Sequence, residues 1–457
     1  MTTSELSALD LEQEPGPVER LLRIFGDVRS GEAGTVLLLL LNLFLILGGY
    51  QICKVAREPL ILASGGAELK SYTAAGQAIV LMFFIPLYSW FASKVDRARL
   101  IFGVTLFFIV NIELFWLGAR IGIPYLGVAF FIWVGIFNNA VIAQFWSYGN
   151  DLYSRQAGDR LFPIIGIGAT LGSPFGTAAA AWLFSNGVDA YTILQITVVV
   201  LFLSIGIYWL VERREGQQRR RPGAGEKLKE GPGGFALLAA SPYLRLVCLL
   251  IILLNVVNTT GNYVLDKFIV AEAASRAAAD PSFNKIAFIG GFAGNVQFWV
   301  NVTAALIQGL LVSRIVKYLG LTGALLALPI VALGSYATVA AGATLALVRF
   351  AKTAENATDY SVMNTARQML WLPTNREEKY KAKQAADTFI VRAGDLASAG
   401  LVFVGAAILE FGPQQFAFAN VVLCLVWLGV ALLLLKEYRR LAGQQQVSAA
   451  GLSTQPR

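Results

Sequence analysis

The segment GTVLLLLLNLFLILGGYQIC, from Gly34 to Cys53, decides the fold of this 457-residue chain. It contains no charged residue over about 20 positions, the length that a helix needs to cross the hydrocarbon core of a bilayer. Similar segments recur along the chain, which is 56% hydrophobic and 14% charged, whereas soluble domains are about 25% charged. The composition therefore predicts an all-α polytopic membrane protein and argues against a soluble enzyme.

Twelve apolar segments are expected to span the membrane. In the first half they cover approximately Gly34–Cys53, Thr73–Ser93, Leu100–Gly118, Tyr125–Trp146, Phe162–Phe184 and Tyr191–Val211. In the second half they cover approximately Leu244–Val264, Phe292–Val312, Leu321–Val339, Thr344–Thr365, Ala385–Leu409 and Phe416–Leu435. Two halves of six helices resemble the major facilitator architecture, in which the halves surround a midplane site.

The domain boundaries follow from this pattern. The expected parts are an N-terminal segment (1–33), a first half (34–211), a basic linker rich in Gly and Pro (212–243), a second half (244–436) and a tail (437–457). Lys and Arg gather in alternate loops, in the linker and in the tail, which the positive-inside bias assigns to the cytoplasm. We expect a multi-pass protein of a bacterial inner membrane with both termini cytoplasmic.

The net charge of +8 does not indicate a nucleic-acid partner, because the basic residues lie at segment ends, as in membrane proteins. The chain has no histidine, and its three cysteines, Cys53, Cys248 and Cys424, are far apart at no metal-binding spacing. We therefore expect no metal site, no cofactor and no catalytic residues. Any proton coupling has to use carboxylates.

Two sets of charged residues lie inside apolar segments of the second half. Lys352, Glu355 and Asp359 are spaced to share one helix face, and Arg392 and Asp395 repeat the spacing. An ionisable residue at membrane depth costs about 2.5 to 3.5 kcal/mol on insertion scales and normally marks a substrate or ion path. The two sets are therefore candidate site residues.

The first segment ends in CKVAREPLI, which places Lys54, Arg57 and Glu58 within about one helical turn. Snorkelling to the headgroups is one explanation; a cavity-facing position is the one we favour, because the helix is expected to continue. Glu113 lies deep in the third segment. It either couples protons or pairs with a basic neighbour, and the sequence favours neither role. In the seventh segment, Asn258 and Asn262 either line the cavity or form interhelical hydrogen bonds.

Four basic residues are assigned to the cavity and together give it an excess of fixed positive charge: Lys54, Arg57, Lys352 and Arg392. Phosphate oxygens are the natural partners of Arg forks and Lys point charges, so the pattern predicts a polyanionic substrate. Separately, SKVDRARL lies between the second and third segments. Its Asp96, Arg97 and Arg99 are predicted to form an acidic and basic gating motif.

GIGATLGSPFG contains Gly168, Gly172 and Gly176 at intervals of four. Because it lies inside an apolar helix and follows no strand, we interpret it as a helix-packing face and not as a phosphate-binding loop.

Three stretches resemble the nucleotide transporters of plastids and intracellular bacteria, the ATP/ADP translocases, and their relatives in free-living bacteria. They are KVAREPLILASGGAEL (Lys54–Leu69), FWSYGNDLYSRQAGDRLFPIIGIGATL (Phe145–Leu171) and DYSVMNTARQMLWLPTNREEKYKAKQAAD (Asp359–Asp387). The resemblance implies exchange of ATP or another nucleoside triphosphate against the diphosphate, or net nucleotide uptake.

The resemblance also implies roles for individual residues. Lys54 and Lys383 stand at positions where the family uses lysines to engage phosphates. Asn262 stands near the position of an acid in the seventh helix of the well-known exchangers, and Asn356 and Asp359 replace two lysines, so the chain is similar to a divergent branch.

We therefore expect a secondary transporter that moves nucleotides or a similar phosphorylated anion by alternating access, as a monomer. Lys54, Arg57, Lys352, Arg392, Lys383 and Asn262 are the predicted substrate-binding residues. Glu58, Glu113, Glu355, Asp359 and Asp395 are the predicted charge partners or coupling residues. The alternatives are a proton-coupled carrier of another organic solute and a membrane scaffold or sensor without transport activity.

Overall fold

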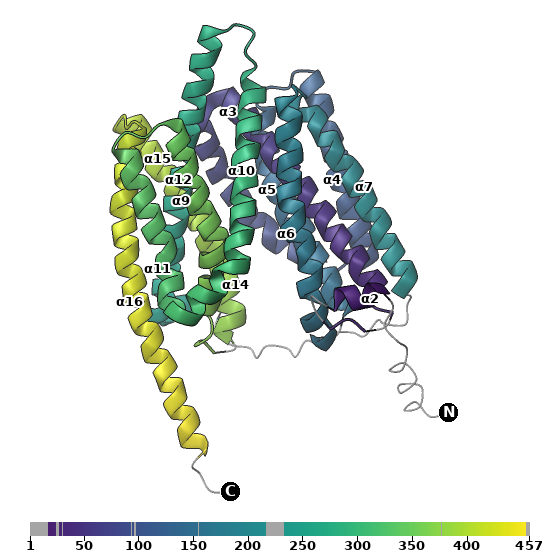
Figure 1. Ribbon diagram of the computed structural model, residues 1–457, viewed down its shortest axis with the longest axis vertical. Coiled ribbons are helices and arrows are strands. Elements are labelled where there is room, and N and C mark those ends of the chain that lie inside the picture. Colours follow the sequence, from purple (N-terminus) through teal and green to yellow (C-terminus); the bar gives the residue numbers. More distant parts are fainter. Residues whose placement is uncertain are drawn as a thin grey trace. The chain divides into compact units, whose positions relative to one another are not determined.

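The computed structural model describes residues 17–23, 27–29, 31–92, 94–95, 97–153, 155–215, 233–375 and 377–453. These residues form helices and no strand (Figure 1). The chain divides into two compact units. The first comprises Met1–Pro59, Leu87–Gly225 and Gly290–Phe298, and the second comprises Leu60–Pro86, Glu226–Ile289 and Trp299–Arg457.

The first unit is built mainly from five helices. They are α3 (Ala33–Ala92) up to Pro59, α4 (Arg97–Arg120), α5 (Leu126–Leu152), α6 (Arg155–Ser185) and α7 (Ala190–Glu215), preceded by the short α2 (Pro17–Leu22). α7 ends inside the predicted linker, of which residues 216–232 lie outside the described part.

Helix α3 bends sharply at Gly65 and Gly66. Gly66 has φ 71° and ψ −165°, a conformation that side chains with a Cβ rarely adopt. The bend divides the helix into two arms. The stretch Leu60–Pro86, which contains the bend and most of the second arm, groups with the second unit. A continuous helix of this length would measure about 90 Å, three times the thickness of the hydrocarbon core, so the bend allows the chain to turn back.

The glycine face of α6 packs directly against the first arm of α3. A Cβ atom on Gly168, Gly172 or Gly176 would overlap the backbone carbonyl oxygens of Leu40, Phe44 and Gly48, respectively. The two backbones are therefore in contact at intervals of four residues, as in small-residue packing of membrane helices. The predicted packing face is confirmed.

The second unit contains the remaining helices. They are α8 (Gly234–Ala240), α9 (Pro242–Ala279), α10 (Lys285–Leu310), α11 (Val312–Ala340), α12 (Leu345–Thr358), α13 (Asn364–Met369), α14 (Lys383–Ala385), α15 (Val391–Phe403) and α16 (Pro413–Ser453), with α10 divided between the units at Phe298. In the described part of the chain, four π-helical turns interrupt the pattern: η2 (Asp359–Met363), η3 (Glu378–Ala382), η4 (Ala386–Ile390) and η5 (Val404–Ile408).

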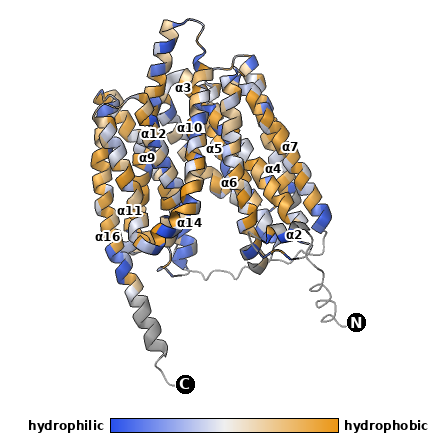
Figure 2. Cartoon of the chain, in the orientation of Figure 1, coloured by the Kyte–Doolittle hydropathy of each residue, from blue (hydrophilic) through white to orange (hydrophobic). Residues whose placement is uncertain are grey.

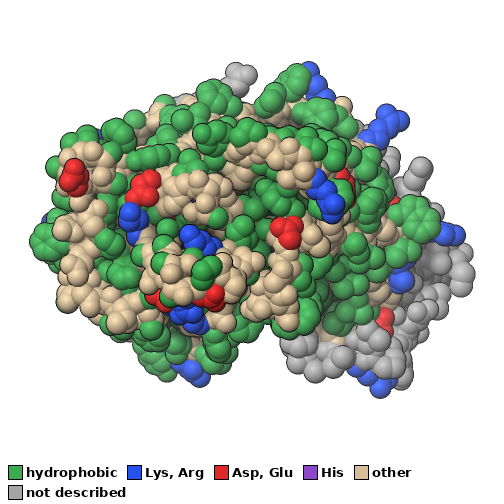
Figure 3. Space-filling view, turned by 90° about the horizontal axis from the view of Figure 1, so that it is seen from above, with side chains coloured by type: hydrophobic (Ala, Val, Ile, Leu, Met, Phe, Trp, Pro, Cys, Tyr) green, Lys and Arg blue, Asp and Glu red, His purple; other side chains and the backbone are tan. Residues whose placement is uncertain are grey.

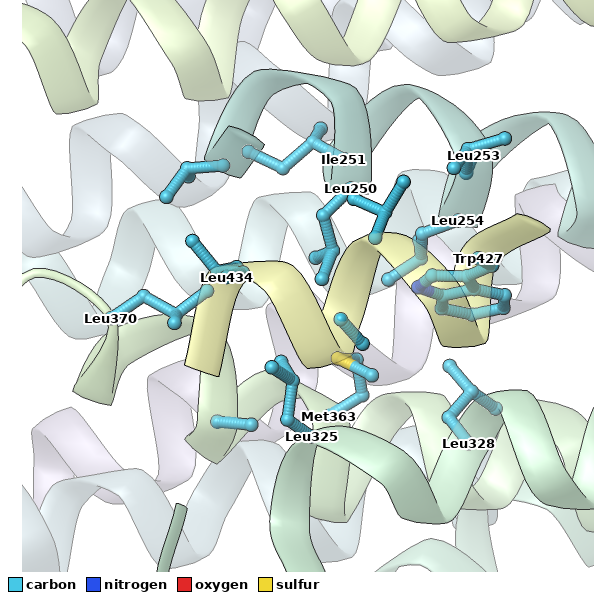
Figure 4. Close-up of a cluster of buried hydrophobic side chains, with 14 of the residues drawn as sticks. Leu250, Ile251, Leu253, Leu254, Leu325, Leu328, Met363, Leu370, Trp427 and Leu434 are labelled. Carbon is cyan, nitrogen blue, oxygen red and sulfur yellow. The ribbon is translucent and has the colours of Figure 1, made fainter. Parts of the chain in front are cut away.

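The core of the second unit joins α9, α11, η2 and α16 (Figure 4). Leu250 and Leu254 of α9, Leu328 of α11, Met363 of η2 and Trp427 of α16 are all buried in this cluster. It holds in place the helices that carry the polar residues described below.

Two predicted boundaries differ from the structure. The seventh segment was expected to end at Val264, but α9 continues to Ala279 because the following stretch is rich in alanine, the strongest helix former. The stretch between the tenth and eleventh expected segments is partly helical, since α13 reaches Met369 and η3 begins at Glu378.

Many large apolar side chains face outward, as expected for a surface in contact with lipid. Phe83, Phe350 and Phe175 are 74%, 72% and 63% exposed, and apolar residues cover the helices along their length (Figure 2). In the view of Figure 3, charged side chains are scattered among hydrophobic ones. Nine helices of the described residues are long and apolar enough to cross a membrane. The predicted count of twelve stays a prediction.

Candidate functional site

A buried ion pair lies at the centre of the second unit. The Lys352 ammonium is 2.9 Å from Glu355 Oε1, one helical turn away on α12, as their spacing predicts. Their side chains are only 3% and 2% exposed. Tyr336 of α11 donates its hydroxyl hydrogen to Glu355 Oε2 at 2.6 Å. The pair is thus enclosed by polar partners, which is the condition under which buried charge is tolerated.

Asn258 of α9 connects this pair to the third charged residue of the set. Lys352 Nζ donates to the Asn258 backbone oxygen at 2.9 Å and to its side-chain oxygen Oδ1 at 3.2 Å. The Asn258 amide nitrogen donates to Asp359 Oδ2 at 3.0 Å, and Asn262 donates to Asn258 Oδ1 at 3.1 Å. Lys352, Glu355 and Asp359 therefore belong to one network, which we call the Asn258 network, together with Tyr336 and Asn262.

A glycine on α9 makes room for this network. A Cβ atom on Gly261 would overlap the hydroxyl of Tyr336 and would come within 2.9 Å of Lys352 Nζ. Its helical backbone needs no special φ, so the reason for glycine is the close approach of the two side chains. Sequence inspection did not single out this position.

A second charged cluster joins the second arm of α3 to α9, and the sequence analysis missed it. Glu68 Oε1 accepts from Lys267 Nζ at 2.8 Å and from the Tyr263 hydroxyl at 2.9 Å. Next to it, Lys70 Nζ lies 2.8 Å from Asp266 Oδ2. We call this group the Glu68 cluster. Its charged α9 residues, Asp266 and Lys267, lie beyond Val264, where the seventh segment was expected to end.

Two arginines form close ion pairs in separate parts of the molecule. In the first unit, Arg57 Nε donates to Glu58 Oε1 at 3.2 Å, and its guanidinium lies 4.3 Å from the centre of the Phe131 ring. In the second unit, Arg392 Nη1 donates to Asp395 Oδ2 at 3.0 Å. The Arg57 and Arg392 side chains are 15% and 20% exposed. Both arginines are therefore within reach of a ligand, unlike Lys352.

The remaining predicted residues are Lys54, Lys383 and Glu113. Lys54 is partly exposed on α3, and the Lys383 ammonium donates to Gln368 at 2.6 Å. Glu113 of α4 accepts a long hydrogen bond, 3.5 Å, from the neutral Gln195 of α7.

The predicted gating motif is only partly described. Asp96 lies outside the described residues, as does the side chain of Arg97, and Arg99 is exposed on α4. Among the described residues, no group of acidic or cysteine side chains is arranged to hold a metal ion.

Comparison with known proteins agrees with this architecture. A family model described as TLC ATP/ADP transporter matches residues 127–438, more than half of the chain. ADP,ATP carrier protein 1 of Chlamydia pneumoniae is 22% identical, over 83% of this chain and 86% of the relative. The chloroplastic ADP,ATP carrier protein 1 of Arabidopsis thaliana is also 22% identical, over 93% of this chain and 77% of the relative.

Solved structures share the fold at low identity. The nucleoside transporter NupG superimposes with a TM-score of 0.62 at 10% identity, over 89% of this chain and 98% of that one. A bacterial homologue of the iron transporter ferroportin, in an inward-facing state, gives 0.61 at 15% identity, over 88% and 98%. The predicted major facilitator-like helical fold is confirmed.

Proposed function

Because the chain belongs to the TLC ATP/ADP transporter family, we propose that it exchanges adenine nucleotides, ATP against ADP, across a membrane by alternating access. The relatives that it matches over most of their length are named as ADP,ATP carriers. We expect no catalysis. We further propose the bacterial inner membrane, cytoplasmic termini, two functional halves with the boundaries given above, and a monomer.

The observation that supports an anionic substrate best is the unused hydrogen-bonding capacity of Arg57. Its Nε is bonded to Glu58, while Nη1 and Nη2 make no hydrogen bond to any described residue. Those two nitrogens form the edge of the guanidinium that binds phosphate oxygens in bidentate geometry. The Phe131 ring holds the guanidinium plane without consuming a donor. We assign Arg57, with Lys54 nearby on α3, to phosphate binding.

Arg392 has a similar surplus in the second unit. Only Nη1 is bonded within the described residues, and Nε is buried without a hydrogen-bond partner there. A buried donor left unpaired costs about 1 to 3 kcal/mol, which a phosphate oxygen would recover. We therefore assign Arg392 to the substrate as well, with Asp395 orienting it.

Lys352 differs from these arginines. Its side chain is 3% exposed, and its ammonium already donates to Glu355 and to two oxygen atoms of Asn258. An ammonium has no further donor to offer after three bonds. We propose that Lys352 supports the Asn258 network and that it does not bind phosphate directly.

The Glu68 cluster suits a contact that is made in one transport state and broken in another. Glu68 and Lys267 are 33% and 36% exposed, so water can replace their ion pair at little cost. The cluster lies where α3 bends and resumes, a position from which the second arm can move relative to α9. We propose that it opens during the transport cycle.

The experiment is uptake of labelled ATP into liposomes that contain the purified protein and are either empty or preloaded with ADP. Uptake only into preloaded vesicles supports exchange; the absence of uptake in both, with folded protein, contradicts the proposal. Arg57→Ala should abolish uptake, and Arg57→Lys should restore part of it at most.

Arg276→Ala is the matched control. Arg276 donates from Nε to Glu272 at 2.7 Å and lies over the Phe288 ring at 4.9 Å, which reproduces the surroundings of Arg57 at an exposed helix end. Uptake should not change in this variant. Equal losses in both variants would show that removal of an arginine, and not of a phosphate ligand, causes the defect.

A further inference from the structure

The charges around the Asn258 network do not cancel. Lys352 and Glu355 neutralise each other at 2.9 Å, and Arg367 is paired with Asp387 at 3.1 Å. The charges of Arg367, Glu355 and Lys352 act on Asp359 through space, but Asp359 forms no ion pair with any of them. Within the part of the chain that the structure describes, Asp359 is therefore left without a cation of its own.

Among the described side chains, Asn258 alone donates a hydrogen bond to Asp359, and this neutral amide has a fixed orientation. Asn258 Oδ1 accepts from both Lys352 and Asn262, so the nitrogen has to point at Asp359. An amide donor stabilises a carboxylate less than a cation does. A proton on the other oxygen, Oδ1, leaves this hydrogen bond intact and removes the uncompensated charge.

Asp359 is also the most accessible of the three charged residues in the network. Glu355 and Lys352 are almost completely buried, whereas Asp359 is partly exposed. It is the first residue of the π-helical turn η2, a local change of helical register of a kind frequently found at functional sites. The turn packs against α11, α12 and α13. Their facing titratable or charged groups are Tyr336 on α11, Lys352 and Glu355 on α12, and Arg367 on α13.

We propose that Asp359 is a reversible proton-binding site that moves one proton with the transported anion. In the step, the carboxylate takes up a proton from water to become a neutral carboxylic acid, and it returns the proton to water on the other side. No bond other than O–H forms or breaks. Proton binding itself is independent of the nucleotide; the coupling rests on the proposed exchange function.

The proton changes the charge balance of that exchange. ATP as a tetra-anion against ADP as a tri-anion moves one net charge, worth about 2.3 kcal/mol per 100 mV of membrane potential. If Asp359 is protonated when it accompanies ATP and ionised when it accompanies ADP, the exchange becomes electroneutral. The exchange rate then responds to a pH gradient and not to the membrane potential.

The first test needs no nucleotide. Infrared spectra of the purified protein should show a carboxylic-acid band that grows as the pH falls from about 7 to about 5, above the ordinary aspartate pKa of about 3.9. The band should shift when the aspartates are labelled with ¹³C. Asp359→Asn should remove this band. Asp359→Glu should restore a carboxyl band that no longer shifts with the aspartate label. Asp395→Asn is the control that keeps the band, because Asp395 is paired with Arg392. The absence of any such band in the unmodified protein overturns the proposal, whatever the variants do.

The second test measures coupling in liposomes that exchange ATP for ADP under a potassium diffusion potential. The unmodified protein should show equal rates at zero and at 100 mV, whereas Asp359→Asn, which is permanently neutral, should become potential-dependent. Exchange by the unmodified protein that follows the potential and ignores a pH gradient overturns the coupling. If neither protein exchanges nucleotide, the proposed function fails while the infrared result still decides whether Asp359 binds a proton.

Discussion

The buried pair Lys352 and Glu355 allows a quantitative test of the second unit. With exposures of 3% and 2%, neither charge can be hydrated when its partner is removed. Breaking a buried pair by removing one partner costs about 3 to 5 kcal/mol, whereas replacing both partners is often close to neutral. Lys352→Met and Glu355→Gln should each lower the free energy of unfolding by about 3 to 5 kcal/mol, and the double variant by clearly less than the sum.

The hydrogen bonds around the pair refine this expectation. Lys352→Met also leaves both Asn258 oxygens without their cationic donor, whereas Glu355→Gln keeps an acceptor for Tyr336. The Lys352 variant should therefore be the less stable of the two.

The assay is unfolding of the purified protein by a denaturing detergent, followed by tryptophan fluorescence and analysed as a double-mutant cycle. The exposed pair Arg276 and Glu272 is the control, with a coupling energy below about 1 kcal/mol. Single variants of the buried pair within about 0.5 kcal/mol of the unmodified protein, or additive effects, would refute the reasoning.

Three further results are expected. Gly172→Val should separate α6 from α3 and abolish accumulation of folded protein in membranes, while Gly103→Ala on α4, where nothing lies within 4 Å, should be tolerated; size-exclusion chromatography distinguishes these outcomes. Burial opposes ionisation of Glu32, but hydrogen bonding and the positive charge of Arg160 hold its pKa below the ordinary 4.5. A depressed pKa stabilises the folded state above pH 4.5 and loses that effect as the pH falls, so Glu32→Gln should cost less than about 1 kcal/mol at pH 7 and progressively less as the pH is lowered below 4.5, measured by unfolding across that range. Glu68→Gln should weaken its contact with Lys267 and change the exchange rate by about two- to fivefold, whereas a rate identical to that of the unmodified protein would exclude the cluster from the transport cycle.

The sequence alone was sufficient for the fold class and for contacts within a helix. Long uncharged segments predict membrane helices because a bilayer leaves the backbone no other partners. The spacing of Lys352 and Glu355, and of Arg392 and Asp395, predicts their ion pairs because residues three apart share a helix face. The glycines of α6 predicted a packing face, although not the helix that would lie on it.

The tertiary structure alone decided which helices share polar contacts. Asn258 meets Lys352 across 94 positions of sequence, and Glu68 meets Lys267 across 199. Neither spacing leaves a local pattern, because such pairs depend on how the chain folds and on which faces of the helices pack together. Gly261 resembles any other glycine until Tyr336 and Lys352 are placed against it. For the same reason, only the structure leaves Asp359 with a neutral amide as its partner, while the nearby cations are bound to other carboxylates.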